Sequence, residues 1–97
     1  MKYTEGMSVC VSVKALYENM SDLTFGHIIP DCEDGVMKYY DLYNEDDELA
    51  CLDGEECMID QVGQVLITLR NINGDGTVYF TLTREEADIA IFNIQED

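Results

Sequence analysis

The chain has few of the residues on which several common functions depend. Its 97 residues include only five lysines and arginines, one histidine and one proline. Neutralising nucleic-acid phosphates takes clustered basic side chains, so direct binding to nucleic acid is disfavoured. No apolar run approaches the roughly 20 residues of a membrane span, and residues 1–6 lack the basic and then apolar order of a signal peptide. We therefore expect a cytosolic protein with no membrane contact.

The single histidine and the cysteine spacing argue against metal and catalytic centres. Structural zinc usually takes close cysteine pairs, whereas Cys51 and Cys57 are separated by five residues and His27 stands alone. No pattern supplies a nucleophile with a base, and there is no glycine-rich phosphate loop. We expect no enzyme activity, no cofactor and no metal. The four cysteines are expected to be reduced and packed as small hydrophobic residues, although an even number would allow two disulfides in an oxidising compartment.

Acidic residues are what the chain has in excess. It contains 21 aspartates and glutamates, and its formal net charge is -16. A small domain needs a net charge of only about 2 to 8 in magnitude for solubility. Hydrophobic residues still make up 46% of the chain, which predicts one folded domain over residues 1–97 rather than a disordered tail. An ordinary acidic surface, or a high-salt cytoplasm, is the alternative to a functional role for this charge.

The acidic residues are concentrated in the middle third. Residues 31–60 hold twelve of them against Lys38 alone, a formal charge of -11. Hydrophobic residues alternate with these acids, so the carboxylates are expected to occupy fixed positions. One or two of the tyrosines in this segment are expected to face the core. The predicted partner-binding residues are Asp31, Glu33, Asp34, Asp41, Glu45, Asp46, Asp47, Glu48, Asp53, Glu55, Glu56, Asp60, Tyr40 and Tyr43.

The hydrophobic pattern predicts an α+β fold. We expect a small, mostly antiparallel β-sheet of about five short strands, with a C-terminal α-helix packed on one face. Alternating valines predict a first strand near 7–16, followed by a connection over 19–26. The dipeptides Asp34-Gly35 and Asp53-Gly54 predict tight turns, which divide the acidic third into short strands near 36–43 and 48–52. The one proline limits any strand around it to an edge or a terminus.

The last third predicts a hairpin. A two-residue turn at Asn73-Gly74 would place Leu69 opposite Val78 and Ile67 opposite Phe80, with every pair on that face apolar. A turn at Asp75-Gly76 would instead bring a charged residue onto the apolar face, so the first register is preferred.

A helix is expected directly after the hairpin. Thr83 and Glu86 have the spacing of a capping box, which marks the start of a helix. Ala87, Ala90, Ile91 and Ile94 share one helical face. This pattern predicts a helix that continues to about Ile94 and packs on the sheet.

The segment 71–78 resembles the first eight positions of the calcium loop of EF-hand and dockerin proteins. Asn71, Asn73 and Asp75 match ligand positions 1, 3 and 5, and Gly76 matches the turn glycine. The resemblance ends there, because position 12 is Leu82 and the flanks alternate as strands. A plain hairpin is therefore preferred over a calcium site.

Two binding functions fit the charge. In the first, the acidic surface imitates a phosphate backbone and occupies the DNA- or RNA-binding groove of a basic enzyme. Anti-restriction and anti-CRISPR proteins of phages are similar to this chain in size and charge. In the second, the domain is an immunity protein or antitoxin that neutralises a basic toxin, with tyrosines as central anchors. A small acidic metal-binding or enzymatic domain is a distant third.

Overall fold

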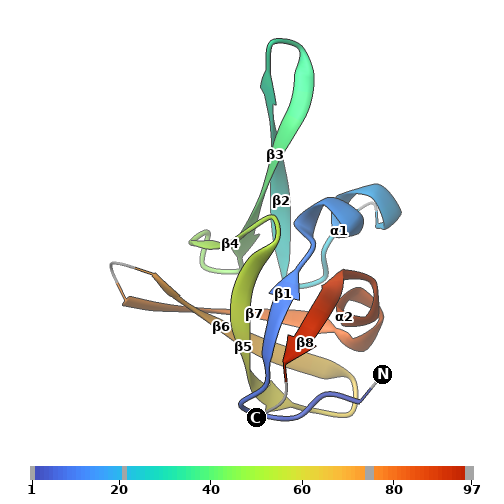
Figure 1. Ribbon diagram of the computed structural model, residues 1–97, viewed down its shortest axis with the longest axis vertical. Coiled ribbons are helices and arrows are strands. Elements are labelled where there is room, and N and C mark those ends of the chain that lie inside the picture. Colours follow the sequence, from blue (N-terminus) through green and yellow to red (C-terminus); the bar gives the residue numbers. More distant parts are fainter. Residues whose placement is uncertain (1, 21, 74–75, 96–97) are drawn as a thin grey trace.

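The computed structural model describes residues 2–20, 22–73 and 76–95, which form two antiparallel sheets and two helices (Figure 1). The elements are β1 (Ser8–Val11), α1 (Val13–Asn19), β2 (Gly26–Glu33), β3 (Val36–Asn44), β4 (Leu49–Leu52), β5 (Glu55–Val62), β6 (Leu66–Asn73), β7 (Gly76–Thr83), α2 (Arg84–Ala90) and β8 (Ile91–Gln95). The expected α+β class and C-terminal helix are confirmed, but the described residues form eight strands rather than about five. Neither described helix is long and apolar enough to cross a membrane.

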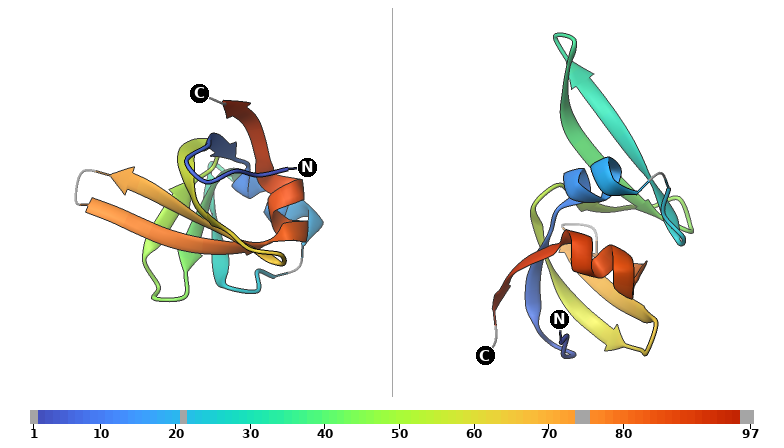
Figure 2. Two further views of the ribbon diagram at one scale, coloured as in Figure 1. Left: turned by 90° about the horizontal axis from the view of Figure 1, so that it is seen from below. Right: turned by 90° about the vertical axis from the view of Figure 1, so that its right-hand side faces the viewer.

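The five-stranded sheet, in the order β7-β6-β5-β1-β8, carries most of the core. Alternate residues of its strands are inaccessible to solvent, as Val9 and Val11 are in β1, because successive side chains point to opposite faces. Helix α2 covers this apolar face beside β6 and β7. Helix α1 packs against both α2 and β3, so it joins the two sheets (Figures 1 and 2).

The three-stranded sheet, in the order β2-β3-β4, is built around a hairpin that projects from the body (Figure 1). Asp34 and Gly35 form its two-residue turn with φ values of 55° and 78°, which confirms the predicted turn. Pro30 lies in β2, which is an edge strand of this sheet, as predicted. At the base of the hairpin a side chain in place of Gly26 would overlap the carbonyl oxygen of Tyr43.

The second Asp-Gly turn has a different role from the first. Gly54 has a φ of 78°, which confirms the turn, and the strand ending at Leu52 was predicted with nearly the observed bounds. Strands β4 and β5, however, belong to different sheets. The turn at Asp53-Gly54 therefore carries the chain from the three-stranded sheet into the five-stranded one.

The first predicted strand is too long, because a helix begins inside it. Strand β1 ends at Val11, and Ser12 caps helix α1 by accepting a hydrogen bond from the N–H of Ala15 at 3.1 Å. A serine at this position satisfies one of the free N–H groups of the first turn. Val13 and Leu16, three positions apart, are the buried residues of the helix. The period-2 pattern of the valines concealed this short helix.

The predicted C-terminal helix begins correctly but ends too late. Its last helical residue is Ala90, and the chain continues as strand β8, in which Ile91 pairs with Val11 of β1. Ala87 and Ala90 lie in the core as expected. The prediction for Ile91 and Ile94 was wrong in secondary structure because β1 needs a partner on its second side, and β-branched residues suit a strand.

The hairpin of β6 and β7 is confirmed, but its predicted register was wrong. Leu69 lies opposite Phe80 rather than Val78, and Ile67 lies opposite Leu82. A shift of two residues keeps every side chain on its predicted face, so the apolar face is the same. The predicted turn at Asn73-Gly74 lies in part outside the described residues.

The capping box of α2 is present and extends to a distant loop. Thr83 accepts a hydrogen bond from the N–H of Glu86, whose Oε1 accepts one from the N–H of Thr83 at 2.8 Å. The second oxygen, Oε2, accepts a hydrogen bond from the N–H of Thr24 at 3.0 Å. Glu86 is inaccessible to solvent, so its carboxylate fastens the loop before β2 to the start of α2.

Replacing this carboxylate should destabilise the fold more than removing the cap. Glu86→Ala removes a buried carboxylate, leaves the N–H groups of Thr24 and Thr83 without this acceptor, and should lower the free energy of unfolding by about 2 to 4 kcal/mol. Thr83→Ala removes one cap bond and should lower it by about 0.5 to 2 kcal/mol. Urea unfolding measures both. The matched control is Glu85→Ala in the same helical turn, where the side chain is exposed; equal losses for Glu85 and Glu86 would contradict the role of Glu86.

Candidate functional site

Eleven of the twelve acidic residues of the middle third lie in three groups, and Asp41 lies apart from them in β3. One group is at the end of the β2–β3 hairpin, a second is the loop 45–48 between β3 and β4, and a third follows the turn into β5. The half-buried members are Asp41, Glu55 and Asp60, and the other nine are exposed. The structure therefore spreads the predicted site residues over several elements instead of one patch.

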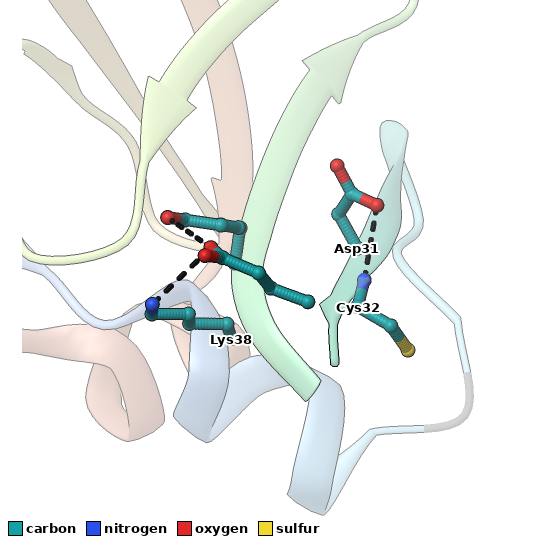
Figure 3. Close-up of polar contacts among 5 residues, drawn as sticks. Asp31, Cys32 and Lys38 are labelled. Atoms are coloured by element: carbon teal, nitrogen blue, oxygen red, sulfur yellow. Dashed lines mark hydrogen bonds and ion pairs between the residues drawn. The ribbon is translucent and has the colours of Figure 1, made fainter. Parts of the chain in front are cut away.

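The end of the hairpin is an exposed acidic arm. All residues from 31 to 39 are exposed, so no described element covers either face of the hairpin there. The Glu33 carboxylate accepts hydrogen bonds from Lys38 Nζ at 3.2 Å and from the Tyr39 hydroxyl at 3.0 Å, while Asp31 Oδ1 accepts one from the N–H of Cys32 at 2.9 Å (Figure 3). These contacts fix the carboxylates relative to the backbone.

The loop 45–48 is organised by one buried amide. Asn44 Oδ1 accepts hydrogen bonds from the N–H groups of Asp46 and Glu48, both at 3.0 Å, which closes the loop on itself. Asn44 Nδ2 donates to the carbonyl oxygen of Tyr79 in β7 at 2.7 Å. The amide thus holds the acidic loop against the five-stranded sheet. Sequence reasoning missed Asn44, although an asparagine just before an acidic turn is a signal for such a loop.

Two of the predicted site residues have contacts inside the fold. Glu55 Oε1 accepts hydrogen bonds from the N–H of Leu52 at 3.0 Å and from Asn71 Nδ2 at 2.6 Å. Asp60 Oδ1 lies 3.9 Å from Arg70 Nε. The Glu55 carboxylate stabilises the junction between the two sheets, and the Asp60 carboxylate contacts a neighbouring strand of the five-stranded sheet. Both carboxylates are therefore less available to a partner than the exposed ones.

The segment that resembles a calcium loop is an ordinary part of a hairpin. Its first residue, Asn71, is buried, and its amide nitrogen donates to the carbonyl oxygen of Ala50 as well as to Glu55. Both flanks are strands, as the sequence indicated. The side chains of Asn73 and Asp75 lie outside the described residues.

The three-stranded sheet has one covered face and one open face. Tyr40, Leu42 and Asn44 of β3 are buried on the covered face, where the Tyr40 ring lies 5.5 Å from that of Tyr17 in α1. Tyr40 therefore has little surface for a partner, in line with the expectation that a tyrosine here faces the core. The open face carries three rows of paired residues, His27–Tyr43–Leu49, Ile29–Asp41–Leu52 and Asp31–Tyr39.

The basic side chains near this open face are each held by a carboxylate and a tyrosine. His27 Nε2 lies 3.3 Å from Asp47 Oδ1, and its ring stacks on Tyr43 with 5.3 Å between centroids. Lys38 Nζ contacts Glu33 and lies 5.9 Å from the centroid of the Tyr39 ring. The Lys38 contacts show what this surface can do chemically, which is to bind a cationic group through charge and an aromatic face.

No protein-family model, no curated protein and no solved structure matches this chain.

The four cysteines are free thiols, and two of them form a buried pair. The sulfur atoms of Cys51 in β4 and Cys57 in β5 are 3.7 Å apart. The hydrogen bond to Cys57, together with burial, raises the pKa of the Cys51 thiol far above its ordinary value. Packing as a hydrophobic residue is confirmed for this pair but not for Cys32, which is exposed at the hairpin end.

The exposed and the buried cysteines should differ in their rate of alkylation. Because the thiolate is the reactive form, iodoacetamide at pH 8 should modify the exposed Cys32 quickly and leave Cys51 unmodified until urea unfolds the chain. Peptide mass spectrometry gives the rate for each residue. The variant Cys32→Ser should lose the fast phase, and modification of Cys51 at the rate of Cys32 in the native protein would contradict the buried thiol pair.

Salt should stabilise the fold. Carboxylates spread over the surface repel one another, and added ions screen this repulsion. The melting temperature should rise by about 5 °C between low salt and a few hundred millimolar NaCl, which corresponds to about 1 kcal/mol for a domain of this size. The rise should shrink in a variant with Glu45→Gln and Asp46→Asn. A melting temperature that stays constant or falls would argue against destabilising repulsion in the native state.

Proposed function

We propose that this chain is an acidic binding protein that occupies the DNA- or RNA-binding groove of a basic partner enzyme. The observation that carries the proposal is the placement of the charge. Nine of the twelve acidic residues of the middle third are exposed, and seven of these lie on the end of the projecting hairpin or on the loop 45–48, the braced loop, which Asn44 holds in place. Charged side chains on such segments can enter a groove without any change in the core. Enzymes that act on nucleic acid in the cell interior would make the cytoplasm its place of action.

Electrostatics support this proposal through association rate and through specificity. An acidic surface attracts a basic groove over a distance of about 10 Å at 0.1 M salt and speeds encounter. Alternate residues of a strand lie about 6.6 Å apart, close to two nucleotide steps of about 3.4 Å each. Asp31 and Glu33 have this alternation in β2, whereas Asp41 in β3 is flanked at both alternate positions by tyrosines. Any phosphate-like array must therefore combine several segments.

Neutralisation of a basic toxin is the second candidate. It is favoured by the open face of the three-stranded sheet, where Tyr43 and Asp41 lie side by side on β3 with apolar neighbours. Interfaces of inhibitor complexes often have central aromatic anchors inside a charged rim. The two candidates differ in the surface of the partner, which is a nucleic-acid groove in the first and a toxin active site in the second.

Reversing charge in the braced loop should abolish partner binding. In the double variant Glu45→Lys and Asp46→Lys, both side chains are exposed and the bond from Asp46 to Asn44 Oδ1 is made by its backbone N–H, so folding should be retained. Proteins captured from the source cell by the wild type should be lost from this variant by about tenfold or more, since clustered charges act together. Duplex or single-stranded nucleic acid should displace them.

The matched control carries the same change of charge elsewhere. Glu5→Lys with Glu18→Lys alters two exposed residues outside the middle third and should keep binding within about twofold. Circular dichroism reports folding of both variants. Partners that the reversed loop still binds would overturn the role of the loop, and bound partners that nucleic acid cannot displace would favour the toxin candidate over the groove.

A further inference from the structure

The open face of the three-stranded sheet exposes large apolar side chains next to one another. Ile29, Tyr39, Leu49 and Leu52 are 47%, 48%, 43% and 45% exposed. The strand pairing places all four on the same face, with Ile29 and Leu52 in one row and Leu49 and Tyr39 in the rows on either side of it. Single exposed hydrophobic residues are common, but a contiguous group with a polar rim marks an interaction site.

The charge around this face decides what can cover it. Asp31 and Asp41 lie within it, and Asp47 at its edge contacts His27. Nucleic acid and an anionic membrane would be repelled by these carboxylates. A second copy of the chain would bring two charges of -16 together. A basic protein surface is the occupant whose charge complements this face.

The middle row points to arginine as the anchoring residue of that partner. Asp41 is half-buried and has no hydrogen-bond or ion-pair partner among the described residues. It lies between Ile29 and Leu52 in its row, with tyrosines two positions before and after it in β3. A guanidinium group binds a carboxylate through two parallel hydrogen bonds and stacks on aromatic rings. An ammonium group is a compact point charge, so it does not form the paired hydrogen bonds and does not stack.

We propose that the open face binds an arginine-bearing segment of a basic protein. Asp41 pairs with the guanidinium group of the arginine, and the exposed apolar residues of the face pack against the aliphatic side chains that flank this arginine in the partner. This inference rests on the proposed function, since it names the contact surface for a basic partner. It adds that charge alone does not select the partner. The contacts of His27 and Lys38 show the same combination of carboxylate and tyrosine within the chain itself.

The test uses three octapeptides, which alternate arginine with leucine, lysine with leucine, and arginine with serine. Titration into the isotopically labelled protein at about 0.15 M NaCl, followed by NMR, gives both the affinity and the residues affected. The arginine–leucine peptide should bind several-fold more tightly than either other peptide, because only it offers both the guanidinium and the apolar contacts. Amide shifts should concentrate on the rows of Ile29, Asp41 and Leu52.

Matched pairs of variants distinguish binding at the open face from a general effect of the protein's negative charge. Asp41→Asn should weaken binding of the arginine–leucine peptide about tenfold, while Glu5→Gln, the same loss of charge at an exposed position before β1, should change the affinity less than twofold. Leu52→Ser should weaken it several-fold, and Val65→Ser, at a 69% exposed residue between β5 and β6, should have no effect. All four positions leave the core intact, and the same spectra report folding.

Each outcome decides the inference. Weaker binding only in the Asp41 and Leu52 variants supports it. Equal effects of both members of a pair, or shifts spread over all acidic segments, overturn it and leave a charge-driven function in place. Absence of binding by every peptide also overturns the inference. The proposed function is then decided separately by the capture experiment with the variant Glu45→Lys and Asp46→Lys, because these substitutions do not alter the open face.

Discussion

Mutual repulsion among 21 acidic side chains is the constraint around which this fold is arranged. The core lies between the five-stranded sheet and the helices, and Glu86 is the only acid buried among the described residues. Its carboxylate is offset by two backbone N–H donors and by the N-terminal end of α2. The remaining described acids keep contact with water, where repulsion is screened. Nine of the twelve acids of the middle third, from Asp31 to Asp53, lie on the three-stranded sheet and its turns, and this sheet shares only one face with the core.

Local sequence signals were sufficient wherever the structure depends on adjacent residues. The Asp34-Gly35 turn, the edge position of Pro30 and the capping box of α2 follow from backbone preferences of a few residues. The signals failed where distant pairing decides. Strand β8 replaces the expected end of the helix because β1 has a free edge, and no local pattern reports that edge. The division into two sheets was missed for the same reason, since the Asp-Gly sequence at residues 53–54 is the same whether the turn joins two strands of one sheet or leads from one sheet to another.

The candidate site was predictable in composition but not in geometry. Counting acids located the charged third, and their exposure agrees with that interpretation. Which of them are available for a partner depends on contacts across the fold, as the bonds of Glu55 to Leu52 and Asn71 show. The open face depends on pairing β2 and β4 on either side of β3, and this brings together Ile29 and Leu52, which are 23 positions apart in the sequence.

The open face and the acidic residues explain each other. An exposed apolar sheet face normally invites association between identical copies, which is why natural sheets protect such surfaces with charge. Here the carboxylates in and around the face repel every copy of the chain and every other acidic protein, yet they do not oppose a basic one. The same charges therefore oppose self-association through the exposed apolar residues and disfavour contact of these residues with other acidic surfaces. Hydrophobic contact gives little discrimination of its own. In the proposed complex the sign of the rim would therefore set the class of partner, and the position of Asp41 between Ile29 and Leu52 would set the geometry that such a partner must match.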